Sequence, residues 1–561
     1  MERSSNNVRG TKQWTIAMMV AAVGALAACG GGGGGGSSGA TPAATQSSSA
    51  NITVASACSG SNCGALGNTY AGSGVGVWQA TNTVPVSIAG LTGQSVTLVY
   101  TNQSAAAQPM PSVSLSGLGL LNTAGTPVAK PAADVAGNDA NAAFDRQLSD
   151  FNIHALDGYA TGAGPLKTQG ASNDTVLRPQ SVASVGTQRT WNHQQPDGTA
   201  TVRTATLRQQ ATATDGRIVN LWVENAEYGS SKISDGSINT LITKFASGTQ
   251  SVYTLATSLV GQPWGSYASS ASLIDPNQAL DIVVLNIQPD GQAYGRVGYF
   301  WARNNFTTSS QPLSNQSLSL YVDSETIYLG GTNGLNTVIS TLGHEFTHMA
   351  NFYQRGVLHG SQYMYGTWLE EMTAMTMEDV LSSQIDPGFN NVRDSRFPAW
   401  LQSAYDCSLT AFDPSLSSSC PGYPISGSLG GFLLRQYGIA YYTNLLQNFS
   451  STDSTAVLNN AIQAGGGAGL GDATGRWGTA VALLPVPGSP SGFAYPARTD
   501  SGFSIPALNG PSYSSQRTMP TSVPATLQGF GQFPVARGTK AGTYSETITV
   551  PAYSTVSIII H

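Results

Sequence analysis

The chain has 561 residues, of which 40% are hydrophobic and only 10% are charged, and its formal net charge is -6. This length allows more than one hydrophobic core, and the low charge content excludes a charged, intrinsically disordered protein. The sequence contains no basic run and no aromatic pattern typical of RNA-binding modules, so we expect no nucleic-acid partner.

Residues 1–28 have the pattern of a secretion signal, because basic residues precede an apolar stretch that is too short for a permanent membrane span. The stretch ends in Leu26-Ala27-Ala28-Cys29, which resembles the cleavage site of bacterial lipoproteins. We therefore expect Cys29 to carry a lipid that tethers the protein to a membrane. The expected location is the cell envelope, with the anchor in the outer membrane, or the extracellular space. An ordinary cleaved signal with an incidental cysteine is the alternative.

Residues 29–50 contain the lipidated cysteine and a Gly/Ser-rich linker. From 51 to 200, short apolar stretches alternate with Gly, Asn and Thr turns, and helical periodicity is hard to find. This pattern predicts a β-rich, sandwich-like module. Its function is open: a spacer, a propeptide-like cover and a binding module are all compatible with the sequence.

Four cysteines remain beyond Cys29, an even number in a chain bound for an oxidising compartment. We expect two local disulfides, Cys58 with Cys63 and Cys407 with Cys420, because the other pairings would join distant segments. A cysteine-based zinc site is the competing interpretation, but no histidine lies near any of the four.

Residues 201–365 combine strand and helix patterns. Residues 201–225 suggest two strands around the turn at 214–216, and 234–259 have helical spacing after the capping candidates Ser234 and Asp235. Further strands are expected in segments 279–287, 297–306 and 317–329. Residues 366–500 are expected to be mainly helical, and 501–561 return to strand alternation. The predicted class is α+β.

Two of the six histidines of the chain flank a glutamate in His344-Glu345-Phe346-Thr347-His348. Positions i and i+4 share one helix face, so both imidazoles can reach one zinc ion while Glu345 projects beside them. Apolar residues at intervals of three and four predict such a helix, with the histidines opposite its buried stripe: Leu335, Val338 or Ile339, Leu342, Phe346, Met349 and Tyr353. Gly343 costs helix propensity, which is understandable where a neighbour approaches closely. A pair of ordinary surface or core histidines is the alternative.

A catalytic zinc site needs a third protein ligand, and Glu370 and Glu371 compete for this role. Thr367 with Glu370 fits a capping box, which would leave Glu371 free to face the histidines as the third ligand. Glu378 lies two turns further on the same face as Glu371, where it could support a ligating histidine or be a plain surface charge.

The spacing of HEFTH and the later WLEE motif resembles the gluzincin clan of zinc peptidases, and HEFTHMANFYQR with the upstream strands is most similar to the hyicolysin peptidase family. The resemblance implies a zincin-like domain with one catalytic Zn²⁺, held by His344, His348 and Glu371, and Glu345 as the general base. It also implies a tyrosine or histidine that stabilises the oxyanion; Tyr423 is our first candidate, with Tyr363, Tyr365 and His359 as others. Met372 departs from the usual Gly or Ala after the glutamate.

In this clan extended substrates pair with an edge strand, for which segment 297–306 is our candidate; a central strand with no role in binding is the alternative. The expected function is a zinc metalloendopeptidase that hydrolyses peptide bonds of extracellular or periplasmic proteins. A surface binding or adhesion lipoprotein with a vestigial or structural zinc site is the main alternative, and a zinc hydrolase of another bond is a third.

Overall fold

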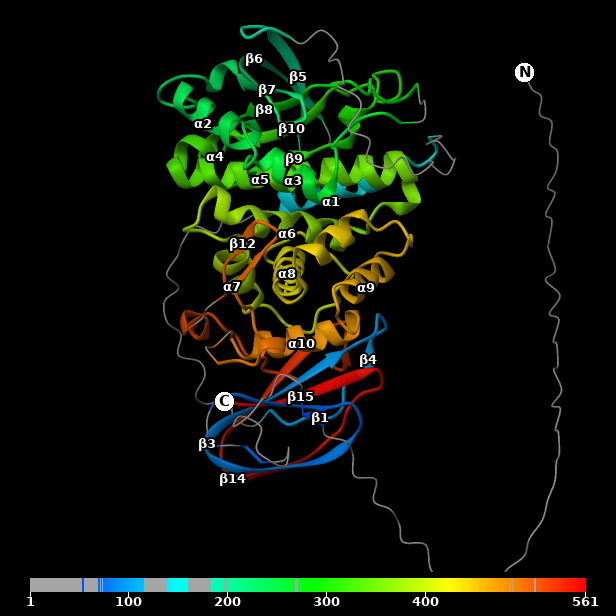
Figure 1. Ribbon diagram of the computed structural model, residues 1–561, viewed down its shortest axis with the longest axis vertical. Coiled ribbons are helices and arrows are strands. Elements are labelled where there is room, and N and C mark those ends of the chain that lie inside the picture. Colours follow the sequence, from blue (N-terminus) through cyan, green and yellow to red (C-terminus); the bar gives the residue numbers. More distant parts are fainter. Residues whose placement is uncertain are drawn as a thin grey trace, which may run out of the picture. The chain divides into compact units, whose positions relative to one another are not determined.

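The computed structural model describes residues 53–54, 69–115 apart from 71 and 73, 139–159, 183–195, 199–267, 271–508 apart from 485 and 487, and 511–561. All of them belong to one compact unit, Ala50–His561. The expected signal and linker, the lipidation site Cys29 and the pair Cys58–Cys63 lie outside these residues. Among the described helices, none has the length and apolar character needed to cross a membrane. The mixed architecture confirms the α+β class (Figure 1).

A five-stranded antiparallel sheet joins strands from both ends of the described chain, in the order β1-β2-β15-β3-β14. The strands are β1 (Thr53–Val54), β2 (Gly76–Ala80), β3 (Val84–Asn102), β14 (Gln532–Ile548) and β15 (Ser554–Ile560). Pairing therefore unites strands that the sequence placed in separate N-terminal and C-terminal segments. Each segment alone would leave strand edges unpaired, whereas in the joint sheet β2, β15 and β3 each have a neighbour on both sides. A short pair, β4 (Gln108–Pro109) with β13 (Thr526–Leu527), also joins the two segments.

The second sheet has six strands in the order β5-β6-β7-β8-β10-β9. They are β5 (Gln188–Gln194), β6 (Ala200–Thr212), β7 (Ile218–Glu224), β8 (Leu280–Leu285), β9 (Gly298–Phe300) and β10 (Leu318–Asp323). β7, β8 and β10 are parallel, and they are almost completely buried, which explains their continuous apolar sequences. β9 is the antiparallel edge strand, which confirms an edge within segment 297–306.

Three boundaries differ from the sequence expectation. The predicted strand 297–306 is shorter, because β9 ends at Phe300 and a 3-10 helix follows at Ala302–Asn305. The helical segment 234–259 is two helices, α2 (Asp235–Ala246) and α3 (Val252–Val260), and Ser234 caps the first, as predicted. The predicted strand 317–329 ends at Asp323, because the Asp323 carboxylate accepts the Thr326 N–H and caps a new helix, α4 (Ser324–Leu329).

The histidine helix is α5 (Gly331–Asn351), and it packs against α6 (Thr367–Ile385). Its predicted apolar stripe is buried in the main core, apart from the partly buried Leu335. A Cβ atom at Gly343 would lie 2.7 Å from Leu381 Cδ1, so the glycine allows α5 and α6 to approach closely. The expectation for Gly343 is therefore confirmed.

The other helices surround α6 or cover the sheets. They are α7 (Phe397–Trp400), α8 (Gly422–Gln447), α9 (Ser454–Ala464) and α10 (Leu470–Ala482). α8 kinks at Gly438, whose φ of 80° favours glycine. A hairpin of β11 (Arg498–Asp500) and β12 (Phe503–Ile505) lies against α8 and α6. The predicted disulfide Cys407–Cys420 is present, with its Cα atoms 5.4 Å apart.

One long helix was not expected from the sequence. α1 (Asp139–His154) lies within the segment predicted to be β-rich, and it packs against α6 and the 3-10 helix Ala302–Asn305. Its apolar residues are few and partly small, so its amphipathic pattern is weak. Phe144 is its large, fully inserted anchor, at 2% exposure.

Candidate metal centre

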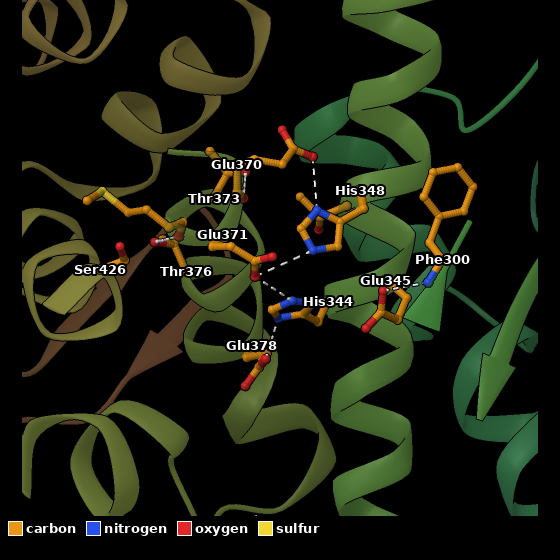
Figure 2. Close-up of polar contacts among 12 residues, drawn as sticks. Phe300, His344, Glu345, His348, Glu370, Glu371, Thr373, Thr376, Glu378 and Ser426 are labelled. Carbon is orange, nitrogen blue, oxygen red and sulfur yellow. Dashed lines mark hydrogen bonds and ion pairs between the residues drawn. The ribbon is translucent and has the colours of Figure 1, made fainter. Parts of the chain in front are cut away.

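Three side chains from two helices converge on one point. His344 and His348 lie one turn apart on α5, with ring centroids 4.7 Å apart. Glu371 Oε2 lies 3.3 Å from His344 Nε2 and 3.7 Å from His348 Nε2. Figure 2 shows this carboxylate between the two rings. One ligand atom from each of these three residues lies within 4.8 Å of the others. Among the described residues, they form the group that could hold a metal ion.

Two further carboxylates bind the opposite nitrogens of the two rings (Figure 2). Glu378 Oε1 lies 2.6 Å from His344 Nδ1, and Glu370 Oε1 lies 2.9 Å from His348 Nδ1. Each Nδ1–H can thus donate to a carboxylate while Nε2 keeps its lone pair for a metal. This geometry confirms the supporting position considered for Glu378.

The predicted capping box of Thr367 and Glu370 is wrong. α6 begins one residue earlier than that motif requires, with Gly366 as N-cap and no side-chain capping bond. The Glu370 carboxylate instead reaches His348, and both of its oxygens accept from Asn351 Nδ2, at 3.2 and 3.1 Å. Sequence reasoning missed Asn351, although its position three residues after His348 on α5 was a usable signal.

The charges around the two rings fit a divalent cation. Four carboxylates, those of Glu345, Glu370, Glu371 and Glu378, are each at most 8% exposed. Burying so many negative charges around two imidazoles is costly unless a cation offsets them. Glu371 Oε2 is also a buried oxygen with no hydrogen-bond partner among the described residues. A tetrahedral zinc ion takes nitrogen and carboxylate oxygen at about 2.0–2.2 Å, which these separations accommodate.

The same groups shift each other's protonation. Burial lowers the pKa of His344, but the nearby carboxylates of Glu371 and Glu378 outweigh burial and raise the pKa to about 9. Burial opposes ionisation of Glu371, yet the two histidines hold its pKa well below its usual range. In the metal-free protein both shifts favour an ionised Glu371 facing a protonated His344, and a bound cation would take the place of that proton.

Glu345 lies beside the ligand group and is held by the edge strand. Its Oε2 accepts the Phe300 N–H at 2.8 Å, so β9 fixes the carboxylate that the sequence predicts to be the base (Figure 2). Burial raises the pKa of Glu345, while the nearby histidines lower it. A carboxylate with a raised pKa is a better proton acceptor than an exposed one.

A cavity of about 60 Å³ opens at this centre, and Tyr423 at the start of α8 lines it with the histidines and Glu345. Tyr423 therefore borders the same cavity as the predicted metal ligands. The other candidates do not: the Tyr365 hydroxyl is buried and donates to the Leu445 carbonyl, and His359 is exposed and stacks on Phe449. Tyr363 does not line the cavity either.

Comparisons with known proteins agree with this site. A family model described as Peptidase M30 matches residues 199–561, and a model of a domain of unknown function, DUF8571, matches residues 56–115. Over 194 residues the chain is 24% identical to "Neutral metalloprotease ShpI" of Staphylococcus hyicus, covering 34% of this chain and 39% of that relative. The chain thus spans well under half of that relative's length.

Solved structures with some similarity include an M1 zinc metallopeptidase from Deinococcus radiodurans, at 12% identity and a TM-score of 0.29. A mutant of a two-domain M1 zinc metallopeptidase bound to L-tryptophan has 10% identity and a TM-score of 0.28. Each match covers 52% of this chain and 60% of the other. The M30 model, by contrast, covers more than half of the chain and includes both histidines and Glu371. The chain belongs to the peptidase M30 family of zinc metallopeptidases.

Proposed function

We propose that this protein is a zinc metalloendopeptidase that hydrolyses peptide bonds of proteins outside the cytoplasm. The observation that carries the proposal is the donor set: Glu371 faces the Nε2 atoms of both histidines while Glu370 and Glu378 hold their Nδ1 atoms. Such a set presents three ligands and leaves one position for water or substrate. A purely structural site has no need of the buried base Glu345 beside it.

In this proposal His344, His348 and Glu371 hold one Zn²⁺, which when bound polarises the scissile carbonyl and acidifies a water molecule. Glu345 accepts the proton from the attacking water and delivers it to the nitrogen of the leaving amine. The hydrogen bond from the Phe300 N–H to Oε2 leaves Oε1 for this transfer. Tyr423 donates its hydroxyl proton in a hydrogen bond to the developing oxyanion.

The substrate and the location belong to the same proposal. We expect an extended substrate to add to the outer edge of β9, because main-chain pairing binds a peptide whatever its side chains. The motif Leu26-Ala27-Ala28-Cys29 supports export and a lipid on Cys29, which would anchor the enzyme in the cell envelope, with the outer membrane as the favoured site.

The test compares the chain with its Glu345→Gln variant, which keeps size and hydrogen bonding but removes the base. Bound zinc is measured by metal analysis, and cleavage of casein is followed with and without a chelator. We expect equal zinc in both proteins, chelator-sensitive cleavage by the parent, and a loss of at least about a hundredfold in the variant. Stoichiometric zinc without Glu345-dependent cleavage of casein or of peptides would contradict the proposal and favour a binding protein.

A further inference from the structure

Helix α1 precedes the segment that matches the M30 family, yet it forms a wall of the catalytic cavity. Leu148, Asn152 and Ile153 of α1 line the cavity of about 60 Å³ together with the zinc-site residues. Figure 1 shows α1 in cyan beside α6. The helix therefore stands next to the place where a substrate has to bind.

The outer edge of β9 has few main-chain groups to offer. Only every second residue of β9 directs its main-chain N–H and C=O groups towards β10. The Asp323 N–H donates to the Val297 carbonyl at 2.8 Å, so Val297 and Tyr299 are the residues that face β10. Gly298 and Phe300 consequently direct their N–H and C=O groups outward from the edge of the sheet, away from β10. The Phe300 N–H is already used by Glu345.

Asn152 binds the remaining outward group of Phe300 and, just beyond β9, the N–H of Ala302 at the start of the following 3-10 helix. Its Nδ2 donates to the Phe300 carbonyl at 3.0 Å, and its Oδ1 accepts the Ala302 N–H at 2.8 Å. A residue in an added parallel strand makes this pair of bonds, donating to residue i and accepting from residue i+2. The side-chain amide of Asn152 thus replaces the main-chain amide of a bound peptide.

Helix α1 does not depend on Asn152 for its attachment. Phe144 packs edge-on against Tyr299 and Trp301, with centroids 5.9 Å apart in both pairs. Arg296 pairs with Asp145 at 2.9 Å, and its guanidinium lies 3.8 Å from the centre of the Phe144 ring. A substitution at Asn152 therefore leaves the anchors of the helix in place.

The two sides of the metal centre are unequal as a result. On the side of Asn152 lies the cavity of about 60 Å³. A second cavity of about 150 Å³ also borders His344 and Glu345, but it meets α1 at its N-terminal half, through Asn141, Ala142 and Asp145. Its other lining residues include Val297, Thr341 and Leu416. Gly298 borders both, so it is the edge residue that remains for pairing with a substrate.

We propose that Asn152 is a specificity-determining residue that limits how far a substrate main chain can extend along β9. This inference rests on the proposed peptidase function. A peptide can pair with Gly298, but it meets the Asn152 amide at Phe300 and Ala302. Peptides with a short segment on the Asn152 side of the scissile bond are preferred. A longer segment has to displace Asn152 or leave the strand edge.

The experiment uses the zinc-loaded full chain and a set of fluorogenic peptides that share one cleaved core and are lengthened stepwise at either end. In the parent we expect kcat/KM to fall with lengthening at one end only. Asn152→Ala should raise kcat/KM for the longest of these peptides about threefold to tenfold through KM, the gain expected from one or two freed hydrogen bonds. The shortest peptide should be cleaved as by the parent.

Two further variants separate the causes. Asn152→Asp keeps the size but loses the donor to the Phe300 carbonyl, so it should shift the length profile in the same direction as Asn152→Ala. Asp150→Asn changes an exposed residue of the same helix that makes no bond to β9 and should match the parent.

An unchanged length profile in Asn152→Ala, with normal cleavage of the shortest peptide, would overturn the inference. An equal loss on all peptides would overturn it too, since α1 would then be only a structural wall. Failure of the proposed function looks different, because the parent would cleave no peptide. The inference is then decided by peptide binding to the zinc-loaded protein: the longest peptide should bind more tightly when Asn152→Ala is introduced, and equal affinity would refute it.

Discussion

Glu370 and Glu371 are consecutive in α6 but approach His348 through different ring nitrogens, so replacing them one at a time separates a ligand from its support. Four-ligand structural sites bind zinc with about 10 to 16 kcal/mol, or about 2.5 to 4 kcal/mol for each ligand. Glu371→Ala should therefore raise the zinc Kd about a hundredfold to a thousandfold. Glu370→Ala leaves all three ligands and should raise the Kd about tenfold to a hundredfold.

The assay is a competition titration of the metal-free protein with zinc in the presence of a chromophoric chelator at neutral pH. Glu378→Ala is the matched control, because Glu378 supports His344 as Glu370 supports His348, and it should resemble Glu370→Ala. Thermal unfolding of the metal-free proteins checks that each variant is folded. A larger loss of affinity in Glu370→Ala than in Glu371→Ala would refute the assignment of Glu371 as the ligand.

Three further predictions concern the surroundings of the site. Tyr423→Phe should lower kcat about a hundredfold to a thousandfold with an unchanged zinc Kd, and a kcat within about twofold of the parent would exclude the oxyanion role. Gly343→Ala gains about 1 kcal/mol of helix propensity, but its Cβ would lie 2.7 Å from Leu381 Cδ1, which should cost about 1 to 3 kcal/mol of overpacking. We therefore expect a lower melting temperature and weaker zinc binding. A higher melting temperature would contradict the close packing of α5 on α6. Burial lowers the pKa of His193 to about 4, so between pH 6.5 and 4 this histidine is protonated in the unfolded chain but neutral in the folded protein. The free energy of unfolding should therefore fall by about 3 kcal/mol as the pH drops through this range. His193→Gln should flatten this part of the pH profile of the metal-free protein in denaturant titrations, and an equally steep profile would show that other groups cause it.

Local patterns were enough for the parts of the site that lie on one helix. The stripe of apolar residues predicted that His344 and His348 share the face opposite the core, and the rarity of histidine made the pair informative. The choice of Glu371 over Glu370 was correct in position but rested on a capping box that does not form. Both carboxylates face the same histidine from consecutive positions, and only the docking of α6 on α5 decides which ring nitrogen each one meets.

The sequence by itself determined the class of chemistry, because the spacing of two histidines and a glutamate on a helix is a property of local geometry. It also determined the pair Cys407–Cys420, since close neighbours leave little choice of partner. Only the tertiary structure decided that β3 and β14 share one sheet across more than four hundred residues, and that α1 reaches the edge strand. Asn152 shows the reason. Its two hydrogen bonds join residues about 150 positions apart, and no local pattern encodes a contact that exists only after separate elements have packed together.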